Sequence, residues 1–183
     1  MTGWHRRSLA ILAIPVCLSY CTEIEEIREP GSRTPASVEQ EAWGWSTVVT
    51  RNGLPRVFVK AEHLIRPSPA DPAKLDGGVT VLFFGLTGED TVSRLRSDRA
   101  RLEDENDRLV AIGRVVLASR DSTHLETDTL VWNRKSDLIR GGGRVLIRRP
   151  GGEETGVGFE ATSDLKRWSM REVTTRLTRP DTV

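Results

Sequence analysis

The sequence predicts an all-β protein built as an elongated stack of strands, and three observations support this prediction. Stretches of alternating apolar and polar residues are separated by turn signals such as the Asn-Gly pair at 52–53. No segment holds the i, i+3, i+4, i+7 apolar stripe of an amphipathic helix. At two places thirty residues apart, an acidic residue is followed fifteen positions later by glycine: Asp98 with Gly113, and Asp128 with Gly143. A β unit repeated at a fixed period indicates stacked strands without a single central core.

The first 21 residues predict an export signal. A positively charged start precedes an apolar run at 9–20, which is shorter than the roughly 17 residues that a membrane-spanning helix needs at least. The run ends at Cys21, as in bacterial lipoprotein signals that are acylated on this cysteine, although Tyr20 stands where those signals have a small residue. A short uncleaved signal-anchor, soluble release into the periplasm and a misassigned start codon remain alternatives to lipidation of Cys21.

The rest of the chain divides into a linker, one folded domain and a tail. Residues 22–41 contain proline, glycine, serine and charges without an apolar period, which predicts a flexible linker. The folded domain is expected at 42–177, and a short tail follows at 178–183. Its strands are expected at residues 43–50, 56–62, 79–84, 91–104, 108–119, 124–133, 137–148, 155–162 and 168–177. The proline- and glycine-rich segment 66–78 is expected to be a loop.

Composition and cysteine positions exclude several classes of function. The chain carries 27 basic and 26 acidic residues, and no basic run is present, so a nucleic-acid partner has little support. Both cysteines lie within the first 21 residues, which leaves the folded domain without a disulfide, a cysteine ligand or a cysteine nucleophile. His63 and His124 do not have metal-ligand spacing, so we expect no metal, no cofactor and no enzyme activity.

The repeated acidic residues have two interpretations. Asp98 and Asp128 could form a pair of carboxylates for acid–base catalysis. Their fixed place in a repeat favours a structural role instead, as a bend or bulge where a long strand crosses between two faces. The glycines at 141–143 lack the lysine and the following helix of a phosphate-binding loop, so they too indicate a strand bend or close packing.

Alternate positions of successive strands place apolar residues on one face. The rows are Leu109, Ala111, Val115 and Leu117, then Val145 and Ile147, then Val157, Phe159 and Ala161. Stacked strands join these rows into a long apolar inner wall. The simplest interpretation is the core of a β-sandwich; the alternative is a wall that lines a groove.

Three segments resemble the LptC family of lipopolysaccharide-export proteins and the related OstA-like domain. They are LETDTLVWN at 125–133, GRVLIRRPGG at 143–152 and TGVGFEA at 155–161, the last of which is similar to the family's Gly-x-Gly-Phe-x-Ala motif. The resemblance covers about residues 42–177. It implies an elongated twisted β-jellyroll, an open V-shaped antiparallel double sheet with an apolar groove. The lipoprotein-like signal is a departure, because many members keep a membrane-spanning helix.

The resemblance also implies a function, a place and a set of partners. The protein would be a membrane-anchored component of the periplasm, held at the inner membrane by its N-terminus. It would take lipopolysaccharide from an inner-membrane ABC transporter of the LptB-F-G type and pass it to an LptA-like bridge protein. Acyl chains would lie in a groove lined by Leu109, Ala111, Val115, Leu117, Val145, Ile147, Val157 and Phe159.

Partners in this family join edge to edge by strand addition. The resemblance therefore implies a transporter-facing edge at Trp45, Thr47 and Val49, and a bridge-facing edge at Val173, Thr175 and Leu177. Scattered arginines could meet lipid phosphates, although a solvated outer face explains them as well: Arg101, Arg108, Arg114, Arg144, Arg148 and Arg149. The alternative function is a membrane-anchored structural or adaptor β-domain that pairs by its edges without binding lipid.

Overall fold

The computed structural model describes residues 40–177, so the predicted signal with Cys21, most of the linker and the tail lie outside the described residues. The strands are β1 (Gln40–Trp43), β2 (Ser46–Arg51), β3 (Leu54–Arg66), β4 (Ala73–Phe84), β5 (Thr91–Ser97), β6 (Arg99–Glu103), β7 (Arg108–Ser119), β8 (His124–Asn133), β9 (Leu138–Arg149), β10 (Gly152–Thr162) and β11 (Trp168–Leu177). One short 3-10 turn, η1 (Asp104–Asn106), is the single helical element in this range. None of the described residues forms a helix long and apolar enough to cross a membrane. The predicted all-β class is confirmed.

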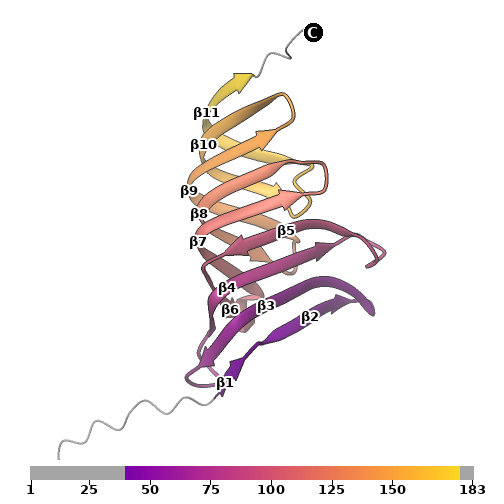
Figure 1. The fold of residues 1–183 in the computed structure, drawn as a ribbon, viewed down its shortest axis with the longest axis vertical. Helices are drawn as coiled ribbons and strands as arrows, with labels where there is room; N and C mark the ends of the chain where they lie inside the picture. Colours follow the sequence, from indigo (N-terminus) through magenta and orange to yellow (C-terminus); the bar gives the residue numbers. More distant parts are fainter. Residues whose placement is uncertain (1–39, 178–183) are drawn as a thin grey trace, which may run out of the picture. The chain divides into compact units, whose positions relative to one another are not determined.

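The strands form one antiparallel sheet in the order β1-β3-β4-β5-β7-β8-β9-β10-β11 (Figure 1). β2 pairs with β3 beside β1, and β6 pairs with β4 and β7 beside β5. β1 and β2 thus lie along the same neighbour, and so do β5 and β6. Each of these two couples takes the place of one long strand that is interrupted in the middle. The sheet therefore has two halves, which we call the β1/β6 half and the β2/β5 half. The long strands β3, β4 and β7 to β11 run through both.

The two halves face each other across a single apolar core. The core in each half is a row of directly paired residues that crosses strand after strand, and none is more than 2% exposed. In the β1/β6 half the row is Leu64, Leu75, Ala100, Ala111 and Leu130. In the β2/β5 half it is Val59, Val81, Leu95, Leu117, Leu125 and Ile147. This arrangement confirms the predicted jellyroll-like double sheet and its apolar inner wall.

A line of bulges folds the sheet into its two halves. The pairing register shifts inside β3, β7, β8 and β10, which is the signature of a β-bulge. Between β5 and β6 the same role falls to Asp98, whose N–H donates to the Gly113 carbonyl at 3.0 Å. The Asp98 carbonyl accepts from the N–H of Gly78 at 3.1 Å, which continues the line to the next strand. The bends predicted at the acidic positions therefore exist at Asp98 and its neighbours.

A direct contact explains the fifteen-residue spacing from Asp98 to Gly113, and the same spacing from Glu62 to Gly77. Gly113 has φ +79°, and a Cβ built on it would lie 2.7 Å from Asp98 Oδ2. Gly77 has φ +78°, and its Cβ would lie 2.7 Å from Glu62 Cβ. In both places the acidic residue packs against glycine backbone on the neighbouring strand. The copy formed by Asp128 and Gly143 keeps the spacing without this contact, because a Cβ on Gly143 would meet nothing within 4 Å.

Several expected strand boundaries are wrong. The strand expected at 43–50 is divided into β1 and β2, β1 begins at Gln40 within the expected linker, and β3 continues to Arg66, beyond the expected end at 62. Two further differences trace to the bend. β4 begins at Ala73, well before the end of the expected loop 66–78, because the glycine pair at 77–78 is a bend inside the strand. The single strand expected at 91–104 is divided into β5 and β6 at Asp98. Glycine and acidic residues that ordinarily mark loops here mark the crossing from one half to the other.

The ion pair at the bend predicts a pH dependence. Arg114 donates from Nε to both carboxyl oxygens of Asp98, at 3.0 and 3.1 Å, and from Nη2 at 2.6 Å. These bonds hold the pKa of the Asp98 carboxyl below its ordinary value of 3.8. A carboxyl group whose pKa is lowered by folding stabilises the folded state at pH values above its ordinary pKa. This stabilisation is lost as the pH falls through the lowered pKa. We expect the free energy of unfolding to drop below about pH 4 for this reason.

Urea unfolding from neutral pH down to about pH 2.5 measures this contribution. Asp98→Asn removes the titrating group, so its stability should fall less steeply in acid than that of the unmodified chain. Asp128→Asn is the control, because Asp128 is exposed and has no side-chain hydrogen bond among residues 40–177. Equal acid slopes for Asp98→Asn and the unmodified chain would contradict the assignment.

Candidate functional site

Seven of the eight residues predicted to line a groove have side chains in the core. Their exposed fractions do not exceed 5%: Leu109, Ala111, Val115, Leu117, Val145, Ile147 and Phe159. They form the inner wall as predicted, and they are covered by the opposite half of the sheet. A lipid chain that reached them would replace contacts between the two halves.

Val157 is the exception, and its prediction as a groove residue is wrong. β10 contains a bulge at Gly158, where φ is +65°. Val157 pairs with the exposed Arg144, whereas Gly156 pairs with the buried Val145. Because directly paired residues lie on the same face of a sheet, Val157 lies on the outer face with Arg144.

Phe159 explains one of the glycines at 141–143. Its ring occupies the space in which a side chain at Gly141 would stand, so the two strands approach closely here. Gly142 and Gly143 face open space. The interpretation of this run as a site of close packing is therefore correct for its first residue.

The interior is open at one end, where β2 and β3 face β6, β7 and β8. A hollow of about 420 Å³ lies there, which we call the entrance hollow. The β2/β5 half contributes Trp45, Thr47, Val49 and Val59, and the β1/β6 half contributes Leu102, Leu109 and Trp132. About half of its lining residues are apolar, and this apolar part continues into the core, since Val59, Leu109 and Trp132 belong to both.

The predicted edge residues of β2 take part in this hollow. Trp45, Thr47 and Val49 are half-buried and line it. Val48 is exposed and also borders the hollow, whereas Ser46 is exposed and does not. β2 nevertheless pairs only with β3 among the described strands, so its backbone edge is free for a partner. Sequence reasoning missed the hollow itself, although the alternation of this strand is the signal that could have indicated an inward face.

The other predicted edge lies at the opposite end of the sheet. β11 pairs only with β10 within residues 40–177. Its residues Val173, Thr175 and Leu177 are exposed, Leu177 to 76%. The two predicted edges are thus the terminal strands of the sheet.

Charged residues at the entrance hollow are paired with one another. Arg66 donates to Asp104 at 2.7 Å, and Lys135 lies 2.8 Å from Asp107, which also contacts Arg134. The bond from Lys135, followed by that from Arg134, holds the pKa of the Asp107 carboxyl below its ordinary value. Because acids and bases balance here, the apolar walls give the hollow its binding character.

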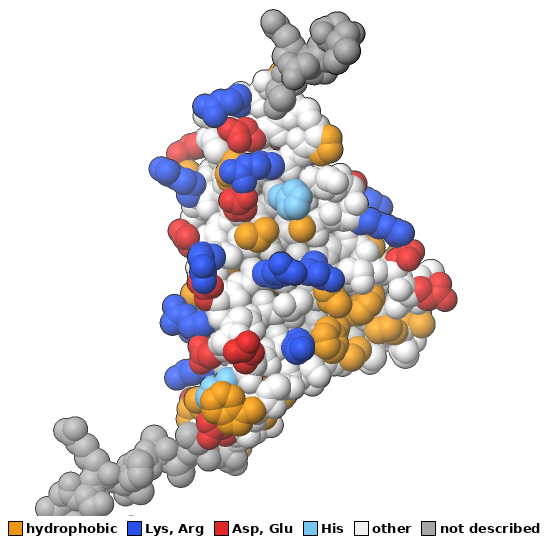
Figure 2. Space-filling model, viewed as in Figure 1, with side chains coloured by type: hydrophobic (Ala, Val, Ile, Leu, Met, Phe, Trp, Pro, Cys, Tyr) orange, Lys and Arg blue, Asp and Glu red, His pale blue; other side chains and the backbone are white. Residues whose placement is uncertain are grey.

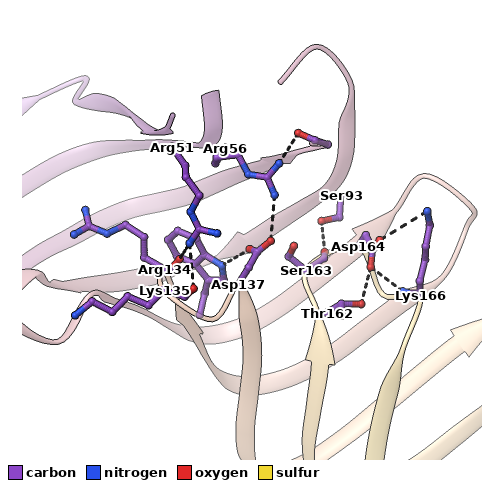
Figure 3. Close-up of polar contacts among 12 residues, drawn as sticks. Arg51, Arg56, Ser93, Arg134, Lys135, Asp137, Thr162, Ser163, Asp164 and Lys166 are labelled. Carbon is purple, nitrogen blue, oxygen red and sulfur yellow. Dashed lines mark hydrogen bonds and ion pairs between the residues drawn. The ribbon is translucent and has the colours of Figure 1, made fainter. Parts of the chain in front are cut away.

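We call the side of the double sheet opposite the line of bulges the mouth. Two turns of the β1/β6 half reach across the mouth to the β2/β5 half (Figure 3). The first is the β8–β9 turn. Asp137 in this turn accepts hydrogen bonds from Arg56 of β3 at 3.3 Å and from the Trp132 indole at 3.1 Å. Arg51 of β2 donates to the carbonyls of residues 134 and 135 at 2.6 and 3.1 Å.

The second turn that reaches across the mouth is the β10–β11 turn. The Ser93 hydroxyl of β5 donates to the Ser163 carbonyl at 2.5 Å, and Leu165 beside it is 1% exposed in the core. The groove predicted to be open along the V is therefore open at its β2 end and bridged along the mouth. Sequence reasoning missed both bridges.

The remaining polar candidates have structural partners. His63 stacks on Trp43 with ring centroids 4.0 Å apart and bonds to Glu41 at 2.8 Å. Residues 40–177 contain no group of three acidic, histidine or cysteine side chains placed to hold a metal. Five of the six scattered arginines pair with acidic residues, which favours a solvated outer face: Arg101, Arg108, Arg114, Arg148 and Arg149. Figure 2 shows both charges interspersed over the face that it presents.

Comparison with protein families identifies the chain. Residues 9–178 match the family model described as lipopolysaccharide-assembly, LptC-related. A comparison with curated proteins finds no match. The family match includes every strand of the sheet and agrees with the resemblance of segments 125–133, 143–152 and 155–161. The chain therefore belongs to the LptC-related family of lipopolysaccharide-assembly proteins, which makes it a periplasmic component of lipopolysaccharide export.

Proposed function

We propose that the interior between the two half-sheets binds acyl chains of lipopolysaccharide and that the chains enter through the entrance hollow. The supporting observation is the hollow itself, whose apolar side chains come from both halves and continue into the core. Burial of apolar chain surface there contributes about 25 cal/mol per Å². Bulges join the halves on one side and turn contacts on the other, so the interior can widen without loss of strand pairing.

The acyl chains come from an inner-membrane ABC transporter of the LptB-F-G type and pass on to an LptA-like bridge protein. β2 and β11 support this direction, because each offers a free backbone edge for strand addition at one end of the sheet. The entrance hollow lies at the β2 end, which supports placing the transporter there. Val173, Thr175 and Leu177 would then meet the bridge protein.

The N-terminus tethers the domain to the inner membrane, through a lipid on Cys21 or through an uncleaved signal-anchor. The support is the pattern of residues 1–21 and lies outside the described structure. Mass spectrometry of the mature N-terminus separates the two, since an acylated chain begins at Cys21 and an anchored one retains residue 1.

Photo-crosslinking at the entrance tests lipid binding. A photo-reactive amino acid at Val49, which lines the hollow, should capture lipopolysaccharide in cells. The same group at Ser46, which is exposed and lies outside the lining of the hollow, should capture little. Absence of lipid at Val49 in a normally folded chain would contradict the proposal and favour the adaptor function, in which the core stays closed and only the edges pair.

A further inference from the structure

The entrance hollow and the closed core meet at Trp132, beside the β8–β9 turn. On one side is the entrance hollow, which Trp132 helps to line. On the other side the core is fully closed, with Leu117, Ile139 and Ile147 at 0% exposure. Acyl chains in the entrance hollow therefore reach the inner core only if the two halves separate near this turn.

Four residues hold the turn against the opposite half, and we call them the clasp: Arg51, Arg56, Trp132 and Asp137. The bond from Arg56 to Asp137 joins residues 81 positions apart, and the bonds from Arg51 join residues 83 and 84 apart. Trp132 donates to Asp137 and also packs edge-on against Phe83 of the β2/β5 half, with ring centroids 5.7 Å apart. Figure 3 shows Arg51 and Arg56 reaching toward the turn that carries Asp137 from two strands of the opposite half.

The polar contacts of the clasp are more accessible to water than the other bridge across the mouth. Arg56 and Asp137 are 16% and 33% exposed, so water replaces their bond when the turn moves away. The bridge at Ser93 is buried and is backed by Leu165 in the core, so its opening exposes apolar surface. Bonds that water can reach are those that open locally in proteins, whereas the apolar contact of Trp132, which is 5% exposed, with Phe83 must separate as well.

We propose that the clasp is a gate between the entrance hollow and the inner core, an inference that rests on the proposed lipid-binding function. With the clasp closed, acyl chains occupy the entrance alone. When the β8–β9 turn leaves β2 and β3, the halves pivot on the line of bulges and the chains advance toward β11. The gate requires no change in strand pairing, because every clasp contact is made by a side chain or by the turn.

Thiol labelling of the full chain in membranes tests the gate without lipid transport. Val145→Cys places a thiol in the closed core, where maleimide reacts only when the interior opens. Adding Asp137→Asn removes the ion pair and should speed labelling of this introduced thiol about fivefold, the factor expected for one weak interaction. Asp128→Asn is the matched control, and the chain that keeps Val145 gives the background from Cys17 and Cys21. Equal labelling with Asp137→Asn and Asp128→Asn would overturn the gate.

A reversible lock connects the gate to lipid. In Arg56→Cys/Asp137→Cys, a bifunctional methanethiosulfonate reagent links the turn to β3, and a reducing agent releases it. A photo-reactive residue at Val49 should capture lipopolysaccharide in both states. One at Ile147 should lose about fivefold or more of its capture when locked and regain it on reduction. The chain with both clasp residues intact, treated with the reagent, is the control.

The outcomes of these experiments distinguish the gate from the lipid-binding function on which it rests. Loss of capture at Ile147 with capture kept at Val49 supports the gate. Equal capture at Ile147 in the locked and reduced states overturns the gate and leaves lipid binding standing. Capture at neither position in any state contradicts lipid binding, and maleimide labelling of the Val145→Cys chains then decides the gate by itself.

Discussion

Gly113→Val is expected to lower the free energy of unfolding by about 3 kcal/mol or more, because two penalties add. The backbone of Gly113 has φ +79°, a conformation that costs a residue with a side chain about 1–2 kcal/mol. In addition, the new Cβ would lie 2.7 Å from Asp98 Oδ2, so the carboxylate must move and lose its bonds to Arg114. Total stabilities are about 5–15 kcal/mol, so this loss is a large share.

Gly142→Val is the matched control for this substitution. Gly142 has no left-handed backbone, is exposed, and leaves open space within 4 Å of a Cβ. Its replacement should change the free energy of unfolding by less than about 1 kcal/mol. Urea unfolding of both variants at neutral pH measures the difference. Similar costs at the two glycines would mean that the bend does not depend on the packing of Asp98 against Gly113.

Leu117→Lys is expected to unfold the domain and abolish export. Leu117 is 0% exposed and pairs directly with Leu95 and Leu125, both also 0% exposed, so an ammonium group there has no partner. Burying an unpaired charge costs several kcal/mol, comparable with the whole stability of a domain. Circular dichroism and protease resistance should show loss of the fold.

Val116→Lys, one position earlier, should be tolerated. Val116 is half-buried on the outer face and pairs with Arg96 and Glu126, which already place charges around it. We expect a change of less than about 1 kcal/mol and preserved export. A folded, export-competent Leu117→Lys chain, or equal damage at both positions, would contradict the assignment of the inner face.

Much of this fold follows from local sequence. Apolar alternation and turn signals define the strands, and the spacing of Asp98 to Gly113 located a bend because the acidic residue packs on that glycine. The inner face was predicted correctly wherever alternation runs unbroken, as along β7. Val157 was assigned to the wrong face because the bulge at Gly158 inserts a residue, and the sequence does not distinguish this glycine from Gly156.

The site was harder to predict, for a physical reason. The terminal strands were recognisable, whereas the closure of the mouth depends on pairs such as Arg56 with Asp137, which lie 81 residues apart. Arginine and aspartate are common residues, and a contact made by the twist of a whole sheet leaves no spacing pattern. The entrance hollow likewise exists because β2 faces β6, β7 and β8, a relation that only the folded sheet establishes.

Photo-crosslinking along β9 tests the central claim most directly, because neighbouring residues of one strand point to opposite sides. Ile147 lies at 0% exposure in the core, and Leu146 beside it is half-buried on the outer face. If acyl chains pass between the half-sheets, a photo-reactive group at Ile147 captures lipopolysaccharide in cells and one at Leu146 does not. Capture at Leu146 alone, or at neither position in a folded and export-competent chain, would contradict lipid passage through the interior.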